Sequence, residues 1–298
     1  MSNRYSDMNN KNHRKLLFVT NPSSGNSRID WPAEIRTYFA SLDYAIEFFQ
    51  LPKNTTQQML EEKISFFKPD LVVAVGGDGT VNLVARCLIK KNISMGILPA
   101  GSANGMAREL NINDEPRKAI EILTKGNTMK IHVTMVNDQL CIHLSDVGLN
   151  AHAIKKFEAQ NSRGMWGYVL ASLKVLWKTP MLKVNMQIDQ QQVNIKAALI
   201  VIANATKYGN GAVINPVGKL DDQVFEIIAI KKISLYEIFK MTFSHAAHDP
   251  EKTEIFQATA LSMHSARKVH FQVDGEYMGK VNSIKANIIP DAIEIIVP

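Results

Sequence analysis

The sequence predicts a two-part chain, in which a doubly wound parallel α/β domain precedes a C-terminal domain of the antiparallel β-sandwich type. Apolar runs typical of buried strands alternate with helical patterns through the first 125 residues. Such alternation requires right-handed βαβ crossovers, which build a parallel sheet. After residue 129 strand-like patterns dominate, which favours a separate antiparallel sandwich or barrel. We expect a disordered tail over 1–13, a nucleotide-binding α/β domain over 14–130 and a β-sandwich lipid-substrate domain over 131–298, whose last strand could return to the first domain.

Composition narrows the classes of protein and partner. The chain has 298 residues, of which 46% are hydrophobic, and this content suffices for a substantial core. Its formal charge of +6 suits a polyanionic ligand or brief contact with an anionic membrane surface. The sequence has no block of basic residues interleaved with aromatics, so we expect no nucleic-acid partner. The two cysteines, Cys87 and Cys141, are expected to be reduced core residues. No apolar run reaches the ~18 residues of a membrane span, and we expect a cytoplasmic protein.

The first domain is expected to alternate strands with helices. Apolar runs predict buried parallel strands at residues 15–20, 44–49, 71–75 and 93–98. Periodicity predicts helices at residues 30–42, 55–67, 80–88, 106–110 and 115–123. Asp30 is expected to cap the first of these helices, Thr55 or Thr56 the second and Thr80 the third.

Three of these strands end in small, polar, glycine-containing loops, at residues 21–26, 76–80 and 99–105. In a parallel sheet the C-terminal ends of the strands share one edge, and ligands bind at that edge in open α/β folds. One such loop would be unremarkable. Three loops at one edge favour a nucleotide site.

The loop at Gly76-Gly77-Asp78-Gly79 carries most of this argument. Glycines let the backbone approach a ligand, and the N-terminus of the following helix attracts anions. The alternative is an ordinary tight turn between a strand and a helix. Asp78 favours a functional loop over a plain turn. A carboxylate would repel a bound phosphate unless a cation or a proton donor lay between the two groups. The loop is neither a Walker A loop nor a Gly-x-Gly-x-x-Gly turn.

The second domain is expected to be rich in strands. Strand-like patterns occur at residues 130–136, 140–144, 182–188, 193–203, 224–230, 268–273, 283–289 and 293–297. Asn137-Asp138 predicts a hairpin turn between the first two. Helical patterns occur at residues 151–159, 165–177 and 235–245.

Four sequence pieces, taken in order, resemble the catalytic-domain family of diacylglycerol kinases, which includes bacterial soluble lipid kinases and sphingosine kinases and is related in fold to NAD kinases. A fifth piece, residues 204–222, resembles the segment that follows in this family. The four pieces are Asn21-Pro-x-Ser-Gly25, Gly76-Gly-Asp-Gly-Thr80, Leu98-Pro-Ala-Gly-Ser-Ala-Asn104 and Asp274-Gly-Glu276.

The resemblance implies an ATP-dependent kinase that phosphorylates a lipid hydroxyl, with a role in phospholipid biosynthesis. Its cofactors would be ATP and Mg²⁺. The lipid alcohol would enter between the domains, and the enzyme would be peripheral at the membrane; whether it forms a homodimer stays open. Backbone N–H groups and small polar side chains would hold the nucleotide. These cofactor-binding residues would be Asn21, Pro22, Ser23, Ser24, Gly25, Gly76, Gly77, Asp78, Gly79, Thr80, Gly101, Ser102 and Asn104.

Asp274-Gly275-Glu276 allows two interpretations. From the residues alone, Asp-Gly predicts a plain type I′ hairpin turn. From the resemblance, Glu276 would be the general base that takes the hydroxyl proton, with Asp274 and Asp78 supplying Mg²⁺ contact and charge. Asp78 competes with Glu276 for the role of base.

The segment from Lys219 to Val224 resembles the one that binds a structural Mg²⁺ in bacterial relatives. It would offer the Asp222 carboxylate and the carbonyls of Lys219 and Val224, which are hard oxygen ligands. A solvated turn is the alternative, because Gln223 stands where the family has glycine.

The sequence departs from the family pattern where acids are common. Leu83, Gly105, His132 and Asn150 stand at these positions. These departures keep alive a second hypothesis, a non-catalytic nucleotide or lipid sensor on the same fold. A third is an NAD-kinase-like enzyme that phosphorylates a soluble nucleotide.

Overall fold

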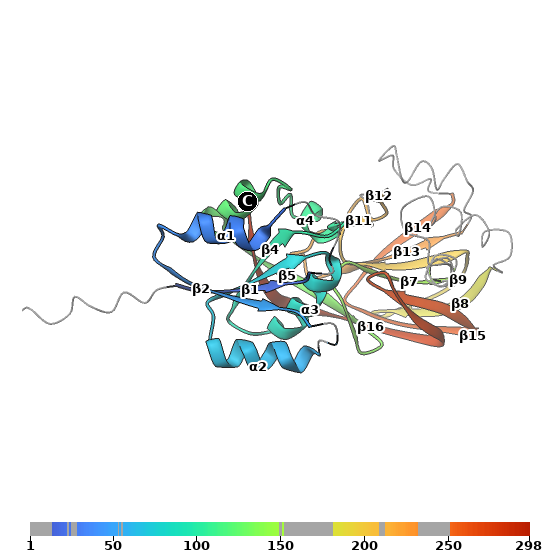
Figure 1. Ribbon diagram of the computed structural model, residues 1–298. Helices are drawn as coiled ribbons and strands as arrows, with labels where there is room; N and C mark the ends of the chain where they lie inside the picture. Colours follow the sequence, from blue (N-terminus) through green and yellow to red (C-terminus); the bar gives the residue numbers. More distant parts are fainter. Residues whose placement is uncertain are drawn as a thin grey trace, which may run out of the picture. The chain divides into compact units, whose positions relative to one another are not determined.

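The structure is a computed structural model, and it divides the chain into two compact units (Figure 1). Unit 1 comprises Met1–Ser102, Asn111–Thr128 and Glu294–Pro298, and unit 2 comprises Ala103–Leu110 and Met129–Ile293. The tail expected at 1–13, the helices expected at 165–177 and 235–245, and all but Ala151 of the helix expected at 151–159 lie outside the described residues. The residues that the structure describes are 14–22, 24, 29–52, 54, 56–148, 151, 181–208, 212–231 and 251–298.

Unit 1 contains the predicted parallel sheet. Its strands are β1 (Arg14–Thr20), β2 (Tyr44–Gln50), β3 (Leu71–Gly76) and β4 (Ser94–Pro99), in the order β4-β3-β1-β2. All pairs are parallel. The end of β16 (Glu276–Val297) adds a fifth strand, because Ile295 pairs with Met95 of β4 in parallel. The sheet thus contains the four strands expected from the apolar runs and the C-terminal segment of the chain.

Two of the helices described in unit 1, α1 and α2, begin where a polar side chain caps them. The Asp30 carboxylate accepts a hydrogen bond from Ala33 N at 3.1 Å, and Thr56 Oγ1 accepts one from Met59 N at 3.4 Å. Figure 1 shows α1 and α2 on opposite faces of the sheet, as in a doubly wound fold. The helices are α1 (Trp31–Phe39), α2 (Gln57–Phe67), α3 (Asp78–Leu88) and α5 (Pro116–Lys125).

The core of unit 1 contains an aromatic cluster around Phe18. This ring is fully buried, stacks on Phe48 with a centroid distance of 5.4 Å and meets Phe39 edge-on at 5.9 Å. The thiol of Cys87 on α3 is also buried, and burial raises its pKa to about 12. Both cysteines are buried and free, as the sequence predicts.

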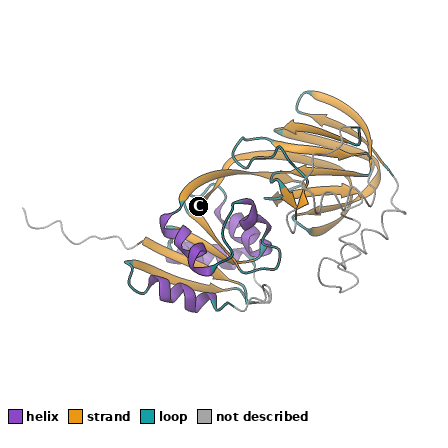
Figure 2. Cartoon of the chain, turned by 90° about the horizontal axis from the view of Figure 1, so that it is seen from above, coloured by secondary structure: helices purple, strands orange, loops and turns teal. Residues whose placement is uncertain are grey.

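Unit 2 is dominated by antiparallel strands, and Figure 2 shows how strands prevail there over helices. Its main sheet runs in the order β14-β13-β10-β7-β15-β16, and β8 pairs with β15 and β9. The short helix α4 (Gly105–Glu109) also belongs to this unit. The strands are β5 (Asn127–Val136), β6 (Gln139–Cys141), β7 (Leu144–Gly148), β8 (Leu182–Ile188), β9 (Gln191–Ala197), β10 (Leu199–Ala203), β11 (Lys207–Tyr208), β12 (Ala212–Val213), β13 (Phe225–Ile230), β14 (Thr253–Ala258), β15 (Ala260–Val273) and β16.

Several of the strands expected in unit 2 differ from those of the structure. The run at 193–203 is two strands, β9 and β10, because Ala198 leaves the β8–β9 ladder and its N–H binds Ile230 O. The runs at 283–289 and 293–297 are parts of one strand, β16, which pairs with β15 before Pro290 and with β4 after it. The sequence patterns also missed β14, whose six residues are buried only at their ends. They missed most of β7 and the first part of β15 as well, because the expected strands covered only 140–144 and 268–273 there. The hairpin at Asn137-Asp138 is confirmed, and both residues have positive φ.

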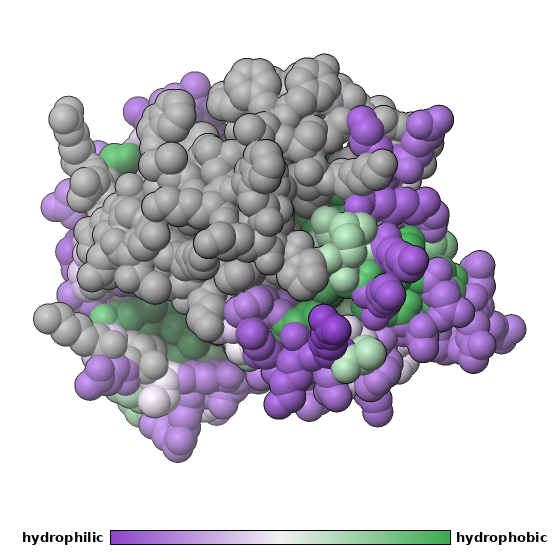
Figure 3. Space-filling model, turned by 90° about the vertical axis from the view of Figure 1, so that its right-hand side faces the viewer, coloured by the Kyte–Doolittle hydropathy of each residue, from purple (hydrophilic) through white to green (hydrophobic). Residues whose placement is uncertain are grey.

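The strands of unit 2 alternate buried and exposed side chains. In β8 the buried positions are Leu182, Val184, Met186 and Ile188. Figure 3 shows a described surface that is mainly hydrophilic in that view, with smaller hydrophobic areas between the polar side chains. Among the described residues, no helix has the length and apolar character that a membrane crossing requires.

We expect Phe18→Ala to lower the free energy of unfolding by about 3–5 kcal/mol, because it removes the centre of the aromatic cluster and leaves a cavity. Urea titration followed by circular dichroism measures this loss. Phe66→Ala is the matched control, since Phe66 is 83% exposed on α2 and its truncation should cost less than about 0.5 kcal/mol. Equal losses in the two variants would contradict this account of the core.

Candidate functional site

The glycine-rich turn of unit 1 leads directly from strand to helix. β3 ends at Gly76, Gly77 is the N-cap, and α3 begins at Asp78. The expectation that Thr80 caps this helix was wrong, because the helix starts two residues earlier and has no side-chain cap. Asp78 therefore lies in the first turn of α3, at the positive end of the helix dipole.

Close contacts explain two of the glycines, one with a side chain and one with a neighbouring backbone. A Cβ at Gly76 would lie 2.3 Å from Thr80 Oγ1, and a Cβ at Gly77 would lie 3.2 Å from the Cα of Gly101. The second contact joins the turn after β3 to the loop after β4. Ala100 N also donates to Gly76 O at 3.0 Å. These two predicted loops are therefore in direct contact.

The loop after β1 joins the same group. Asn21 N donates to Val75 O at 3.2 Å, and Asn21 Nδ2 donates to Thr80 Oγ1 at 3.4 Å. Three of the loops singled out in the sequence thus meet at the C-terminal edge of the parallel sheet. Ser23 and Gly25 lie outside the described residues.

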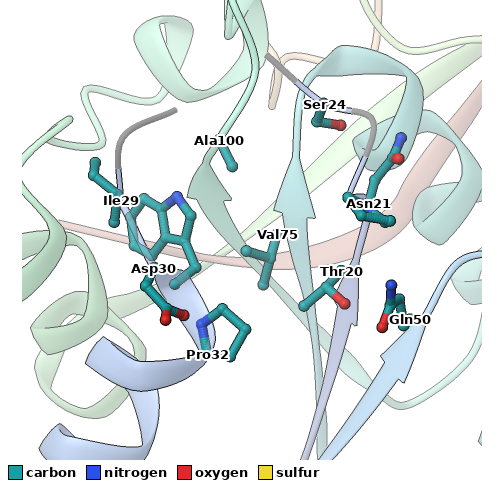
Figure 4. Close-up of a pocket in the computed structure, with 11 residues that line it drawn as sticks. Thr20, Asn21, Ser24, Ile29, Asp30, Pro32, Gln50, Val75 and Ala100 are labelled. Carbon is teal, nitrogen blue, oxygen red and sulfur yellow. The ribbon is translucent and has the colours of Figure 1, made fainter. Parts of the chain in front are cut away.

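A cavity of about 290 Å³ opens beside Asn21 at this edge (Figure 4). Figure 4 shows Thr20, Asn21 and Gln50 on one side of it and Ile29, Asp30 and Pro32 on the other. Polar amides and hydroxyls facing apolar surface are typical of a small-molecule site. Its lining residues are Thr20, Asn21, Pro22, Ser24, Ile29, Asp30, Trp31, Pro32, Gln50, Val75 and Ala100.

Sequence reasoning missed part of this lining. Gln50 ends β2, so its position at the carboxyl end of a parallel strand was a usable signal. Trp31 and its neighbours at the start of α1 carried no comparable signal, because a tryptophan in the first turn of a helix is usually a core residue. Of the other expected ligands, Gly101 is half-buried, Ser102 is exposed, and Asn104 is buried with a φ of 51°.

The Asp274-Gly275-Glu276 piece forms a hairpin turn in unit 2. Asp274 and Gly275 have φ values of 47° and 87°, and Val273 pairs with Glu276 across the turn. Both positive angles fit the type I′ turn that the residues alone predict. Glu276 begins β16 and its side chain is exposed. A hairpin turn and a reactive carboxylate are therefore compatible interpretations of this piece.

The carboxylate of Asp274 is directed at the backbone between β6 and β7. It accepts hydrogen bonds from the N–H groups of Ile142, His143 and Leu144, at 3.0, 2.9 and 3.1 Å. Burial raises the pKa of Asp274, and these three N–H donors oppose the rise. Such contacts favour a positioning role for Asp274, and its contact with Mg²⁺ stays a prediction.

The turn expected to bind a structural Mg²⁺ is held by protein contacts. Gln223 has a φ of 62°, and its N–H donates to Nδ1 of His132 at 3.1 Å. The exposed Asp222 carboxylate accepts Val224 N at 3.3 Å. Across the described ranges, no three His, Cys, Asp or Glu side chains gather as a metal site. A single carboxylate provides few of the oxygen ligands that Mg²⁺ requires. The site at Lys219, Asp222 and Val224 therefore stays a prediction.

Comparison with known proteins gives the same organisation. Residues 15–136 match the family model of the diacylglycerol kinase catalytic domain, and residues 145–297 match that of the YegS C-terminal NAD kinase beta sandwich-like domain. The chain belongs to the diacylglycerol kinase family. The two matches are consecutive along the chain and together cover most of it.

Individual relatives of this family member are distant. A Synechocystis protein, sll0036, is 26% identical over 266 residues, which are 86% of this chain and 60% of that protein. The chain thus spans less than two thirds of that relative. A diacylglycerol kinase from Staphylococcus saprophyticus is 25% identical over 238 residues, 77% of each chain.

Solved structures support the fold. A diacylglycerol kinase from Bacillus anthracis superposes with a TM-score of 0.75 at 18% identity, covering 96% of this chain and 97% of that one. An NAD kinase from Archaeoglobus fulgidus in complex with ATP gives 0.56 at 15% identity, covering 95% and 93%. At these identities the likeness establishes the fold alone.

One departure from the family pattern has a clear structural consequence. His132 is only 1% exposed, and its Nε2 has no hydrogen-bond partner within the described structure. Burial lowers the pKa of His132, so the neutral imidazole is favoured. This neutral ring is what accepts the N–H of Gln223 and fixes the 219–224 turn. Asn150, another departure, lies outside the described residues.

We expect the stability of the protein to fall as the pH drops below about 6.5, the ordinary pKa of histidine. Because the pKa of His132 is lower in the folded state, the unfolded chain binds the proton first, and stability is complete only above that pH. Urea titrations between pH 5.5 and 7.5 should show a weaker pH dependence in His132→Gln. His264→Gln, at an exposed position of β15, should retain the wild-type dependence. An unchanged dependence in His132→Gln would be inconsistent with the buried neutral ring.

Proposed function

We propose that this protein transfers the γ-phosphoryl group of ATP to the hydroxyl of a lipid alcohol, such as a diacylglycerol or a sphingoid base. The observation that carries the proposal is the meeting of three loops in unit 1 around the N-terminus of α3, with Asp78 in its first turn. Membership of the diacylglycerol kinase family supports the lipid alcohol as acceptor. The relative from Staphylococcus saprophyticus is itself named a diacylglycerol kinase.

The proposed chemistry needs positioning and charge neutralisation more than covalent catalysis. Phosphates would lie at the N-terminus of α3, where the helix dipole favours negative charge. Asp78 would orient Mg²⁺, which supplies positive charge to the phosphates when bound. Glu276 would take the proton of the acceptor hydroxyl as the hydroxyl oxygen attacks the γ-phosphorus and the bond to the leaving ADP breaks. Its exposure supports this role, because a base must reach the substrate.

Two other functions compete with this one. An NAD-kinase-like enzyme would use a related fold, but the structural likeness to the NAD kinase is weaker, with a TM-score of 0.56 against 0.75. A non-catalytic sensor would account for Leu83, Gly105 and His132 at positions where the family commonly has acids. Both alternatives make distinct predictions in a single transfer assay.

We expect wild-type protein to transfer label from [γ-³²P]ATP·Mg²⁺ to a lipid alcohol in mixed micelles. Asp78→Asn and Glu276→Gln should each reduce kcat by about 100-fold or more, because each removes a charge or a base from the reaction. Glu62→Gln, on α2, is the control for loss of an exposed carboxylate.

The same assay separates the alternatives when soluble NAD is included. Label on NAD alone would assign an NAD-kinase-like activity. ATP binding with no labelled acceptor in wild type would refute the kinase proposal and favour the sensor.

We further propose that the exposed face of β9, β8, β15 and β16 contacts the anionic membrane surface. Lys183 and Lys196 are directly opposite each other in register, an arrangement that like charges disfavour. An anionic partner would relieve this repulsion. The segments 182–197, 260–273 and 276–287 contain two acidic residues. These are Asp189, in the turn between β8 and β9, and Glu276, at the hairpin before β16. The cations of these segments are Lys183, Lys196, Arg267, Lys268, Lys280 and Lys285.

Replacing Lys183, Lys196 and Arg267 by Gln should lower partition onto vesicles of 30% phosphatidylserine by about 100-fold, since each cation near an anionic surface contributes about 1 kcal/mol. Vesicle co-sedimentation at low salt measures the partition. The control replaces three exposed lysines of unit 1, Lys91, Lys118 and Lys125, and carries the same change in net charge. Similar losses in both triple variants would indicate a general charge effect and reject this face as the contact.

A further inference from the structure

The side chain of Glu276 has no hydrogen bond or ion pair of its own among the described residues. Its position therefore depends on its backbone, and so on the hairpin turn at Asp274-Gly275. An exposed two-residue turn is ordinarily free to fluctuate. What fixes this turn also fixes the carboxylate.

Gln272 holds the turn from the interior of unit 2. It lies on β15, four residues before Glu276, and is fully buried. Its Oε1 accepts the N–H of Gly275 at 2.8 Å, and its Nε2 donates to Oδ2 of Asp146 at 2.5 Å. Since a backbone N–H only donates and a carboxylate only accepts, just one orientation of the amide satisfies both partners.

Asp146 fixes that orientation. It lies on β7, directly opposite Gln272 in the antiparallel register, and is 1% exposed. Its other oxygen, Oδ1, accepts the N–H of Ala151 at 2.9 Å. Burying a carboxylate is costly, and an apolar pair of similar volume would often be as stable. A buried Asp–Gln pair therefore points to a demand for orientation rather than for stability.

The rest of the turn is tied to the same strand and its approach. Asp274 N donates to Leu144 O at 2.9 Å, and Ser145 Oγ donates to Gln272 O at 2.6 Å. With the three N–H groups that Asp274 accepts, the backbone before Glu276 is held on both sides. Gln272 is the member of this network that reaches Gly275, the residue directly before Glu276.

We propose that Gln272, oriented by Asp146, is a positioning residue that fixes the Asp274–Glu276 turn and thereby aims the Glu276 carboxylate at the acceptor hydroxyl. This inference rests on the proposed kinase function. Gln272 acts only through the turn, and its effect on the reaction passes through Glu276.

The test compares Gln272→Met with Gln257→Met. Gln257 on β14 donates to the buried carboxylate of Glu226 at 3.1 Å, so it makes the same kind of bond in the same unit away from the turn. We expect Gln272→Met to lower kcat by about 10- to 100-fold, a loss typical of a misplaced catalytic group, with KM for ATP within about twofold of wild type. Gln257→Met should retain wild-type kcat.

Asp146→Asn supplies a second, nearly isosteric variant. An amide that replaces the carboxylate can present Nδ2 to Gln272, which turns the Gln272 amide over and faces its Nε2 toward the N–H of Gly275. We expect a loss of kcat similar to that of Gln272→Met. Wild-type kcat in a folded Asp146→Asn variant would overturn the role given to Asp146.

A double mutant tests the route of the effect. In a Glu276→Gln background, Gln272→Met should cause no further loss of kcat, because the carboxylate that it positions is already gone. A full additional loss in this background, or equal losses in Gln272→Met and Gln257→Met, would overturn the inference.

Hydrogen exchange separates failure of this inference from failure of the proposed function. The Gly275 amide should exchange slowly in wild type and at least 10-fold faster in Gln272→Met, whether or not the protein is a kinase. A protected Gly275 amide in an inactive wild type would refute the kinase function and the catalytic consequence, but not the fixing of the turn by Gln272. A rapidly exchanging Gly275 amide in wild type would show that Gln272 does not fix the turn, and would overturn the inference itself.

Discussion

The close approach of three backbones at the C-terminal edge of the parallel sheet is the constraint on which the candidate nucleotide site depends. Gly76 leaves room for the Thr80 side chain, and Gly77 leaves room for Gly101 in the loop after β4. Asn21 donates one hydrogen bond to the Val75 carbonyl of β3 and another to the Thr80 hydroxyl. Because a Cβ at Gly76 would collide with the Thr80 side chain and one at Gly77 would crowd Gly101, the strand-to-helix turn and the two loops are closely packed. Asp78 is presented from this arrangement at the start of α3.

The second unit positions its candidate carboxylate by a different device. A two-residue hairpin turn has little packing of its own, and here it is held by hydrogen bonds from buried polar side chains. Gln272 accepts a hydrogen bond from the N–H of Gly275. The Asp274 carboxylate accepts three more, from the N–H groups of residues 142–144, where the chain enters β7. The apparent conflict between a plain turn and a functional motif disappears, because a well-held turn is what a positioned carboxylate requires.

The departures from the family pattern also acquire a physical meaning. His132 stands where bacterial relatives commonly have an acid, and it accepts a backbone N–H from Gln223. The imidazole ring thus stabilises the 219–224 turn through a hydrogen bond to its backbone. Gln223 adopts a positive φ that glycine would take more easily, so this local arrangement carries some backbone strain. The change affects the 219–224 turn and leaves the three loops of unit 1 intact.

The sequence by itself determined the two-part architecture, the parallel strands, the three glycine-containing loops and the family, because periodicity, turn residues and motif order are local properties. It could not determine that β16 runs unbroken past Pro290, since pairing with β15 and then β4 is a long-range choice. It placed the cap of α3 at Thr80, because hydroxyl residues usually cap, whereas the helix starts at Asp78 and the Thr80 side chain lies against Gly76. Trp31 beside the cavity, and the pair of Gln272 with Asp146, emerged only from the tertiary structure. Residues 126 positions apart in the chain become partners only through the register of β7 and β15.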